Sequence, residues 1–392
     1  MNEPVIIGAA RTPMGSFQGE LSSCSGTELG AFAIEGALKN SNINPYEVEE
    51  LLMGCVLPAG LRQAPARQAG IRANLPKSVP AVTVNKVCGS GMKTILMASD
   101  QIRSGSSSVV VAGGMESMSN APYLSNFTRT GRRLGHSSLE DHMFTDGLED
   151  AFQPKTLMGH FAEDCAQKYQ FTREAQDEFA IESLSRAIKS QKDNMFNNEI
   201  VPIILGAGNE RINVTEDEQP KHAKADKIPF LKPAFQNNGS ITAANASSIS
   251  DGAAALVICS SRKAKENSIP MRAKIVGYAG YAQEANWFTT APIYAVKNLL
   301  SNVGWEKNDV DLWEVNEAFA VVPMVFMSEM DIPSNRINIR GGACALGHPI
   351  GASGARIVVT LLNALEIHGL KKGIASICLG GGEALAIAIE RV

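Results

Sequence analysis

The sequence has no excess of basic residues and no long unbroken run of apolar ones. Its 36 Lys and Arg stand against 40 Asp and Glu, which gives a formal net charge of -4. Proteins that bind nucleic acid usually present a basic face, so this balance argues against that class. No stretch of about 18 apolar residues is found, as a membrane-spanning helix would need, and the N-terminus lacks a basic targeting segment. We expect a cytoplasmic globular protein with no nucleic-acid and no membrane partner.

Paired cysteines are also missing. The seven Cys are odd in number and form no CxxC pair, which disfavours a disulfide framework and a structural zinc site. We expect reduced thiols, most of them packed as small apolar side chains. The 392 residues are too many for one ordinary domain and suggest two or three.

Two parts of the chain carry the same order of features. A helical pattern, a strand-like segment, a Gly-rich turn with a reactive side chain and an apolar strand ending in glycines follow one another twice. The segments are 29–39, 51–55, 87–91 and 109–114 in the first part, and 294–302, 312–316, 346–351 and 375–382 in the second. Such units are typical of βαβ pieces with buried parallel strands. The order predicts two related α/β halves, with chance similarity as the alternative.

Between these parts, from about residue 117 to 245, the composition changes. An irregular segment with Arg and acidic residues runs to about residue 150, and a polar stretch covers 206–238. Helices are predicted over 158–169 and after Thr172, a suitable N-cap, with an apolar stripe formed by Ala180, Leu184, Ala187 and Ile188. We interpret this block as an insertion over the core, where ligand contacts are common.

Cys88 is the first candidate for chemistry. It follows a predicted strand (81–84) and precedes a helix, with Gly89 and Gly91 at the turn. The positive end of a helix dipole favours a thiolate, and exposed backbone N–H groups could stabilise an oxyanion. The turn fails the phosphate-loop pattern, because no Gly directly precedes Lys93. An inert buried cysteine remains the alternative.

Three more residues could complete a site. His348, between Gly347 and Pro349, is either structural or a base of near-neutral pKa for a thiol. Cys378 precedes three glycines and suits a general acid or base, and Asn316 could hold a water beside a thioester oxygen. A metal site is disfavoured because Cys88, His348 and Cys378 have unrelated spacings, and a redox pair is similarly disfavoured.

Taken together, these motifs resemble the thiolase family. The resemblance is carried along the whole chain by Ala9–Pro13, Val87–Gly91, Gly113–Met118, Asn245–Ser247, Asn316–Phe319, Gly341–Gly354 and Cys378–Gly382. It implies an α/β fold with a duplicated five-layer α-β-α-β-α core and an inserted loop domain. The expected limits are 1–118 with about 243–268 for the N-terminal half, 119–242 for the CoA-binding loop domain and 269–392 for the C-terminal half.

The resemblance implies an acyltransferase that joins two acetyl-CoA molecules into acetoacetyl-CoA and CoA. Cys88 would carry the acyl group, His348 would help it become a thiolate, and Cys378 would move the α-proton. His348 and a water on Asn316 would stabilise the enolate. The backbone N–H groups of Cys88 and Gly380 would form a second oxyanion hole.

For substrate binding, the resemblance implies coenzyme A thioesters and no tightly bound cofactor or metal. The expected contacts are Leu148, Met158, Phe235, Ala243, Ala246, Ser247, Ala318 and Phe319 along the pantetheine, and Lys221 near the phosphates. A solvated surface charge is the alternative for Lys221. The resemblance also implies a homotetramer (a dimer of dimers) or a homodimer.

Within the family, residues 113–123 are most similar to short-chain acetoacetyl-CoA thiolases. Two positions depart from the pattern: Leu157 stands where many members have His, and Arg340 replaces a small polar residue. A broader 3-ketoacyl-CoA thiolase of fatty-acid degradation is the nearest alternative. A condensing enzyme with a second active-site His and a non-catalytic CoA binder are disfavoured by the presence of Cys88, His348 and Cys378 together.

Overall fold

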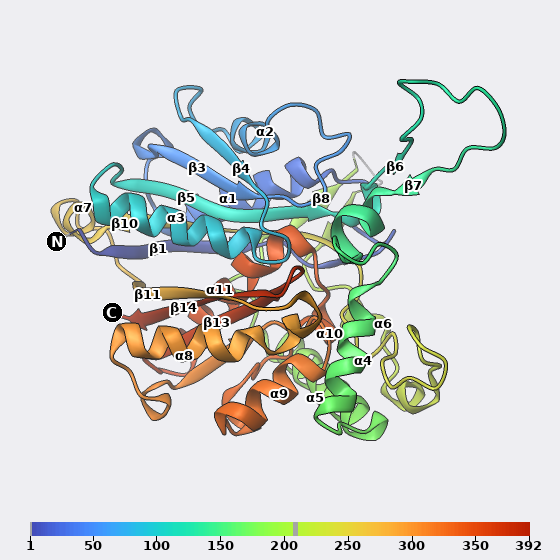
Figure 1. Ribbon diagram of the computed structural model, residues 1–392. Helices are drawn as coiled ribbons and strands as arrows, with labels where there is room; N and C mark the ends of the chain where they lie inside the picture. The colour runs from blue at the N-terminus through green and yellow to red at the C-terminus, as the bar shows by residue number, and fades with distance from the viewer. Residues whose placement is uncertain (1, 207–210) are drawn as a thin grey trace.

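The chain folds into two halves of the same design, with an inserted block against one end (Figure 1). The computed structural model describes residues 2–206 and 211–392. Strands of the N-terminal half lie in the order β4-β3-β5-β10-β1. Their bounds are β1 Pro4–Arg11, β3 Glu50–Gly54, β4 Ala81–Val84, β5 Val109–Ser117 and β10 Ser250–Ser260, with β2 Gly15–Ser16 paired to β10.

The C-terminal half repeats this sheet. Its strands lie in the order β12-β13-β14-β11, with bounds β11 Ala273–Ala282, β12 Leu312–Val315, β13 Lys372–Leu379 and β14 Glu383–Arg391. The two sheets meet where β1 pairs with β11, Val5 opposite Lys274 and Ile6 opposite Ala273. In each half a parallel pair (β3–β5, β12–β13) is followed by an antiparallel one (β5–β10, β13–β14). The same order of parallel and antiparallel strand pairs in both halves confirms the predicted repeat.

The prediction of parallel strands is correct only in part. β3 pairs in parallel with β4 and β5, and β12 does so with β13. The contacts of β1, β10, β11 and β14 are antiparallel. The motifs reveal strands joined by helices, whereas β10 enters the sheet after the inserted block, from the opposite direction.

The two sheets and the helices that cover them form five layers, in the order helices, sheet, helices, sheet, helices. The helices of the two halves are α1 Gly26–Ser41, α2 Pro65–Arg72, α3 Ser90–Ser104, α7 Ser261–Glu266, α8 Ala291–Val303, α9 Val321–Met330, α10 Ala343–Leu346 and α11 Ile350–Ile367. One apolar core joins α1 to the outer face of the first sheet, and another joins α8 and α9 to the outer face of the second. The third core places α3 and α11 between the sheets. The duplicated five-layer core that the resemblance implies is therefore present.

Helix α11 corrects one expectation about membranes. By length and composition it could cross a membrane, with a mean hydropathy of 1.4 over 18 residues. However, 89% of this window is buried inside the protein, where α11 forms the middle layer. Its apolar character is explained by contact with both sheets.

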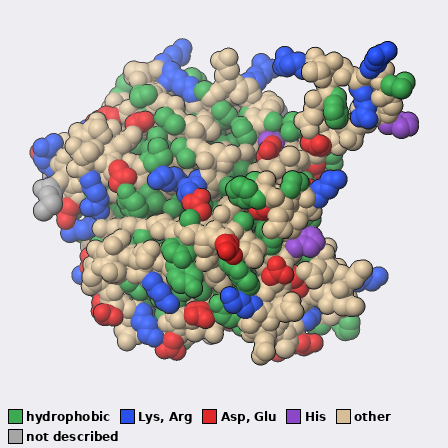
Figure 2. All heavy atoms as spheres, viewed as in Figure 1, with side chains coloured by type: hydrophobic (Ala, Val, Ile, Leu, Met, Phe, Trp, Pro, Cys, Tyr) green, Lys and Arg blue, Asp and Glu red, His purple; other side chains and the backbone are tan. Residues whose placement is uncertain are grey.

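The inserted block consists of short strands and helices beside the open end of the sheets. Its elements are β6 Tyr123–Leu124, β7 Glu140–Asp141, α4 Met158–Lys168, α5 Arg173–Lys192, β8 Ile203–Leu205, β9 Ile212–Val214 and α6 Gln219–His222. Thr172 caps α5 as predicted, because its side chain accepts from Ala175 N–H. The apolar stripe of α5 ends earlier than expected, since Ile188 is exposed. The segment between β6 and β7 projects from the body and carries basic side chains (Figures 1 and 2).

A buried ion network anchors the inserted block to the core. Arg11 Nε lies 2.6 Å from Glu199 Oε1, and Arg11 Nη1 lies 2.6 Å from Asp217 Oδ1. Arg340, one of the two unusual positions, is also buried and lies 3.6 Å from Glu199. It donates to the carbonyl oxygen of Met195 at 3.0 Å. Arg340 therefore belongs to this anchor and not to the substrate pocket.

Candidate active site

The N-termini of α3 and α11 meet at a contact that only glycine permits. A Cβ added to Gly91, in the first turn of α3, would lie 2.9 Å from the carbonyl oxygen of Gly351 in α11, and one added to Gly114 on the adjacent strand β5 would lie 2.0 Å from the same oxygen. Real Cβ atoms do not approach so closely, so the backbones can touch only without side chains. Cys88 precedes α3 and His348 precedes α11. The contact therefore brings these two side chains, one from each half, into a single space.

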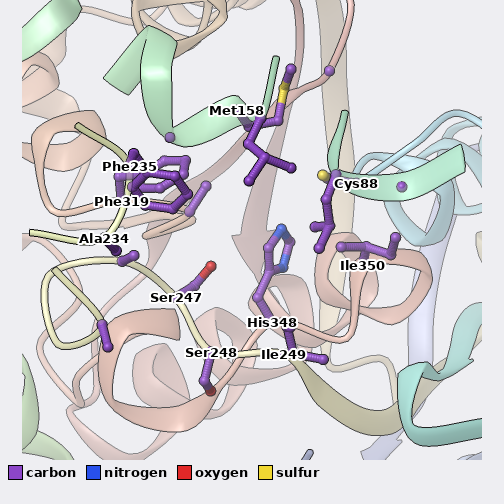
Figure 3. Close-up of a pocket in the computed structure, with 18 of the residues that line it drawn as sticks. Cys88, Met158, Ala234, Phe235, Ser247, Ser248, Ile249, Phe319, His348 and Ile350 are labelled. Carbon is purple, nitrogen blue, oxygen red and sulfur yellow. The ribbon is translucent and has the colours of Figure 1, made fainter. Parts of the chain in front are cut away.

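That space is a cavity of about 520 Å³. Figure 3 shows Cys88 and His348 pointing into it, with Phe235 and Phe319 across from them. It is lined by four predicted catalytic residues, Cys88, His348, Cys378 and Gly380, and by eight predicted binding residues, Leu148, Met158, Phe235, Ala243, Ala246, Ser247, Ala318 and Phe319. The structure thus gathers predicted residues from Cys88 to Gly380, 292 positions apart in sequence, around one pocket.

Cys88 sits in a turn with unusual backbone geometry. Val87 has a φ of +45°, in the left-handed region that a β-branched residue rarely adopts. Such outliers are typical of functional sites, where the surrounding structure maintains the strain. The pKa of Cys88 is raised to about 12 by burial, although the N–H groups of Gly380 and Cys88 facing the sulfur lower it in part. Burial therefore outweighs the effect of the helix end, and the Cys88 thiol is protonated in the resting protein.

His348 is held in one defined orientation. Its Nδ1 lies 2.6 Å from Ser353 Oγ, and the Ser353 hydroxyl donates to the carbonyl oxygen of Pro349 at 2.9 Å. Since that hydroxyl proton is in use, Ser353 accepts from Nδ1–H, and Nε2 keeps its lone pair. Within the described part of the chain, Nε2 is buried without a hydrogen-bond partner. It can therefore accept a proton.

The near-neutral pKa predicted for His348 is wrong. Burial, assisted by the positive charge of Arg356, lowers the pKa of His348 to about 3. The ring is neutral at rest, which is the form that a base requires. A buried imidazolium is stable only while a negative group forms beside it.

Cys378 lies at the end of β13 and is almost fully buried. Burial, together with the nearby Cys88 sulfur, raises the pKa of Cys378 well above its ordinary value. The two thiols therefore lie close enough to influence each other, and both are protonated at rest. Gly380 follows in a turn continued by Gly381 and Gly382, whose φ values of +85° and +86° require glycine.

Two predicted residues lie outside the cavity lining. Asn316 is fully buried just after β12, and across residues 2–206 and 211–392 its Oδ1 and Nδ2 have no protein partner. Such orphaned amide atoms fit the predicted role of holding a water. Lys221 is on α6 and pairs with Glu20, with Nζ 3.2 Å from Oε2. Its neighbour Gln219 reaches the cavity, so Lys221 lies near the mouth.

A loop from residue 234 to 248 forms the wall opposite Cys88. Phe235 and Phe319 meet edge to face, with ring centroids 6.0 Å apart. Glu163, buried on α4, accepts from the N–H groups of Ser240 and Ile241 at 2.9 Å. Through these hydrogen bonds, the Glu163 carboxylate holds the middle of the loop in place.

Several contributing residues are missed by the sequence analysis. The remaining lining residues are Ser16, Phe17, Phe144, Gly147, Leu157, Gly159, Gln219, Ala234, Thr242, Ser248, Ile249, Phe288 and Ile350. Of these, Leu157 is one of the two positions that depart from the family pattern, and the structure places it in the cavity wall. Ile350 and Ser353 lie within the Gly341–Gly354 motif and could have been found there, whereas Phe17 reaches the cavity through the pairing of Ser16 with Ser250.

Comparison with known proteins agrees with this geometry. Residues 4–262 match the family model "Thiolase, N-terminal domain", and residues 269–391 match "Thiolase, C-terminal domain". A probable acetyl-CoA acetyltransferase of Dictyostelium discoideum is 47% identical over 389 residues, covering 99% of this chain and 94% of the relative. Acetyl-CoA acetyltransferase 2 of Arabidopsis thaliana is 48% identical over 388 residues, covering 98% and 96%.

Solved structures give the same result. The crystal structure of the Bacillus anthracis acetyl-CoA acetyltransferase matches with a TM-score of 0.97 and 39% identity, covering 100% of this chain and 99% of that one. A thiolase from Ascaris suum, solved in complex with coenzyme A, matches with a TM-score of 0.93 and 44% identity over the whole of both chains.

Proposed function

This chain belongs to the thiolase family, and from that premise we propose that its pocket condenses two acetyl-CoA molecules into acetoacetyl-CoA and CoA. The chain is an acyltransferase of the acetyl-CoA C-acetyltransferase type, and the broader-chain alternative is not favoured by its relatives. One observation carries the mechanism: Cys88, the free Nε2 of His348 and Cys378 all face one cavity.

In the first half-reaction, Cys88 attacks the carbonyl carbon of acetyl-CoA. Its proton passes to Nε2 of His348 as the new S–C bond forms. The bond from carbon to the CoA sulfur breaks, and Cys378 donates its proton to that sulfur. The products are acetyl-Cys88 and CoA, with Cys378 left as a thiolate and His348 as an imidazolium. The N–H groups of Cys88 and Gly380 face the reacting sulfur, where they can stabilise the tetrahedral oxyanion.

In the second half-reaction, the Cys378 thiolate takes an α-proton from a second acetyl-CoA. The enolate oxygen needs donors, each typically worth about 3–4 kcal/mol. Nε2–H of His348 is one donor, and a water on Asn316 is the proposed other. The enolate carbon attacks acetyl-Cys88, and the departing Cys88 sulfur recovers its proton from His348. Both thiols and the neutral imidazole are restored, so every proton is accounted for.

Coenzyme A is the substrate carrier and is proposed to enter past the loop at 234–248. The apolar lining, with Met158, Phe235 and Phe319, suits the pantetheine arm. Lys221 is proposed to meet a phosphate at the mouth after releasing Glu20. A coenzyme A thioester is thus required as a substrate.

We further propose a cytoplasmic homotetramer or homodimer. The family resemblance suggests the assembly, and exposed apolar side chains on the projecting segment, Leu134 and Leu139 among them, support it. The free cysteines agree with a reducing compartment. Light scattering after gel filtration tests the assembly, and cell fractionation tests the location.

The decisive experiment follows radiolabelled acetyl-CoA. The intact protein should acquire one acetyl group on Cys88, lose it on adding CoA, and form acetoacetyl-CoA when CoA is removed. Cys88→Ala should acquire no label. Label on another residue, or none on the intact protein, contradicts the proposal.

A further inference from the structure

A second buried carboxylate lies on the acyl side of the pocket, outside the set of reacting groups. Glu116, in the last residues of β5, is 1% exposed. It accepts from the N–H groups of Val56 at 3.0 Å, Leu57 at 3.1 Å and Gly351 at 2.9 Å. The thiol of Cys55 lies 3.6 Å away. The carboxylate is thus met by neutral donors, most of them backbone groups.

These donors come from both halves of the protein. Val56 and Leu57 follow β3 in the N-terminal half, whereas Gly351 is in the first turn of α11 in the C-terminal half. When Glu116 is ionised, its negative charge also matches the positive end of α11. One side chain therefore joins backbone segments of both halves.

The same segments support one wall of the pocket beside Cys88. Val56, Leu57 and Ile350 belong to a small apolar cluster, and Cys88, Phe144 and Leu148 pack against it. A Cβ on Gly147 would lie 3.0 Å from Ile350 Cδ1 and 3.4 Å from Leu57 Cδ2. Ile350 and Gly147 line the cavity beside Cys88, and Leu57 packs behind them.

We propose that Glu116 is a positioning residue that sets the width of the acyl pocket: it fixes the backbone of Leu57 and Gly351, so that Ile350 and Gly147 keep their places in the pocket wall. It also holds the turn that carries His348, two residues before Ile350. Glu116 touches neither substrate nor reacting atoms, so it acts through these neighbours. The inference deepens the proposed function and rests on it.

The test compares Glu116→Gln with the wild type in acyl transfer to Cys88. Quenched-flow mass spectrometry gives the acylation rate with acetyl-, propionyl- and butyryl-CoA. A misplaced catalytic geometry costs about 100-fold, and we expect a loss of this order with acetyl-CoA. We expect a smaller loss with butyryl-CoA, because the loosened wall admits a longer chain. The KM for CoA in the cleavage direction should stay within about twofold, because the loop at 234–248 is untouched.

The control is Asp311→Asn. Asp311 likewise accepts two backbone N–H groups, those of Lys371 and Lys372, at 2.9 and 2.8 Å. It lies before β12, at the end of the sheet away from Asn316. Its loss should lower stability and leave the ratio of acetyl to butyryl rates unchanged.

The proposal is overturned if Glu116→Gln keeps the wild-type rate and ratio, or if Asp311→Asn shifts the ratio equally. Should Glu116→Gln fail to fold, Glu116→Asp carries the same test, since its shorter side chain retracts from the N–H groups it must hold. Absence of acyl transfer in the wild type would instead contradict the proposed function, so the two failures are distinguishable.

Discussion

The hydrogen bond between His348 and Ser353 makes the mechanism quantitatively testable. Ser353→Ala removes the acceptor of Nδ1–H at 2.6 Å. In acylation the ring becomes an imidazolium, and a hydrogen bond to a charged group contributes about 1.5–3 kcal/mol. Because about 1.4 kcal/mol is tenfold in rate, acylation of Cys88 should slow by roughly 10- to 150-fold. Without Ser353, His348 could also adopt the tautomer that carries its proton on Nε2. In that tautomer Nε2 has no lone pair with which to accept the proton of Cys88.

The assay is the burst of acyl-enzyme formation, measured by quenched flow at saturating acetyl-CoA. Ser353 does not line the cavity, so the KM should change little. Ser260→Ala is the matched control: Ser260 is also 1% exposed and caps α7, away from the pocket. It should cost about 1 kcal/mol of stability with an unchanged burst.

A double-mutant comparison separates positioning from general damage. In a His348→Asn background no imidazole remains to be positioned, so Ser353→Ala should slow the residual acylation no further. A burst within about twofold of wild type in Ser353→Ala, or an equal loss in both backgrounds, would refute the assigned role.

Three other changes have defined outcomes. Glu163→Gln should raise the KM for CoA about tenfold and leave kcat largely unchanged, because only the binding loop at 234–248 loses support. Each hydrogen bond to a charged group contributes about 1.5–3 kcal/mol. Steady-state cleavage of acetoacetyl-CoA measures the KM and the kcat. Gly114→Ala should destabilise the protein by about 3 kcal/mol, the upper end for an overpacked core, since its Cβ would lie 2.0 Å from a carbonyl oxygen. Gly280→Ala, with contacts of 3.4 Å or more, should leave the unfolding free energy in urea nearly unchanged. Burial raises the pKa of Glu116 to about 7 in the folded state. The folded protein therefore holds a proton that the unfolded chain releases near pH 4.5, and the unfolding free energy should fall by on the order of 3 kcal/mol as pH rises from 4.5 through 7. This component should be missing from Glu116→Gln in denaturation curves at pH 5 and pH 8.

Local patterns were enough to predict the repeated elements. The helices around residues 29–39 and 294–302 and the strand at 81–84 are present because hydrophobic periodicity depends on neighbouring residues. The turns carrying Cys88 and His348 are recognisable for the same reason. The exact limits of the three predicted units stay a prediction.

Features that depend on residues far apart in sequence could not be predicted from local patterns. The direction of a strand in the sheet is such a feature, since more than 130 residues separate β5 from β10, with which it pairs. The pKa values are another: the sequence reveals a helix end beside Cys88 but not the burial that outweighs it. Glu116 shows the same limit, because its three backbone donors lie 60, 59 and 235 positions away.

The glycine contact between α3 and α11 divides the enzyme into a part that tolerates no variation and a part that invites it. Gly91, Gly114 and Gly351 leave no volume for any side chain, so the separation of nucleophile and base is set by backbone atoms alone. The opposite walls, including Leu157 and Phe288, consist of side chains that can be exchanged without moving that pair. A library of variants meant to accept other acyl groups should therefore randomise these wall residues and keep the glycines. Each variant would then retain the placement of Cys88 and His348 and differ only in the acyl groups that it binds.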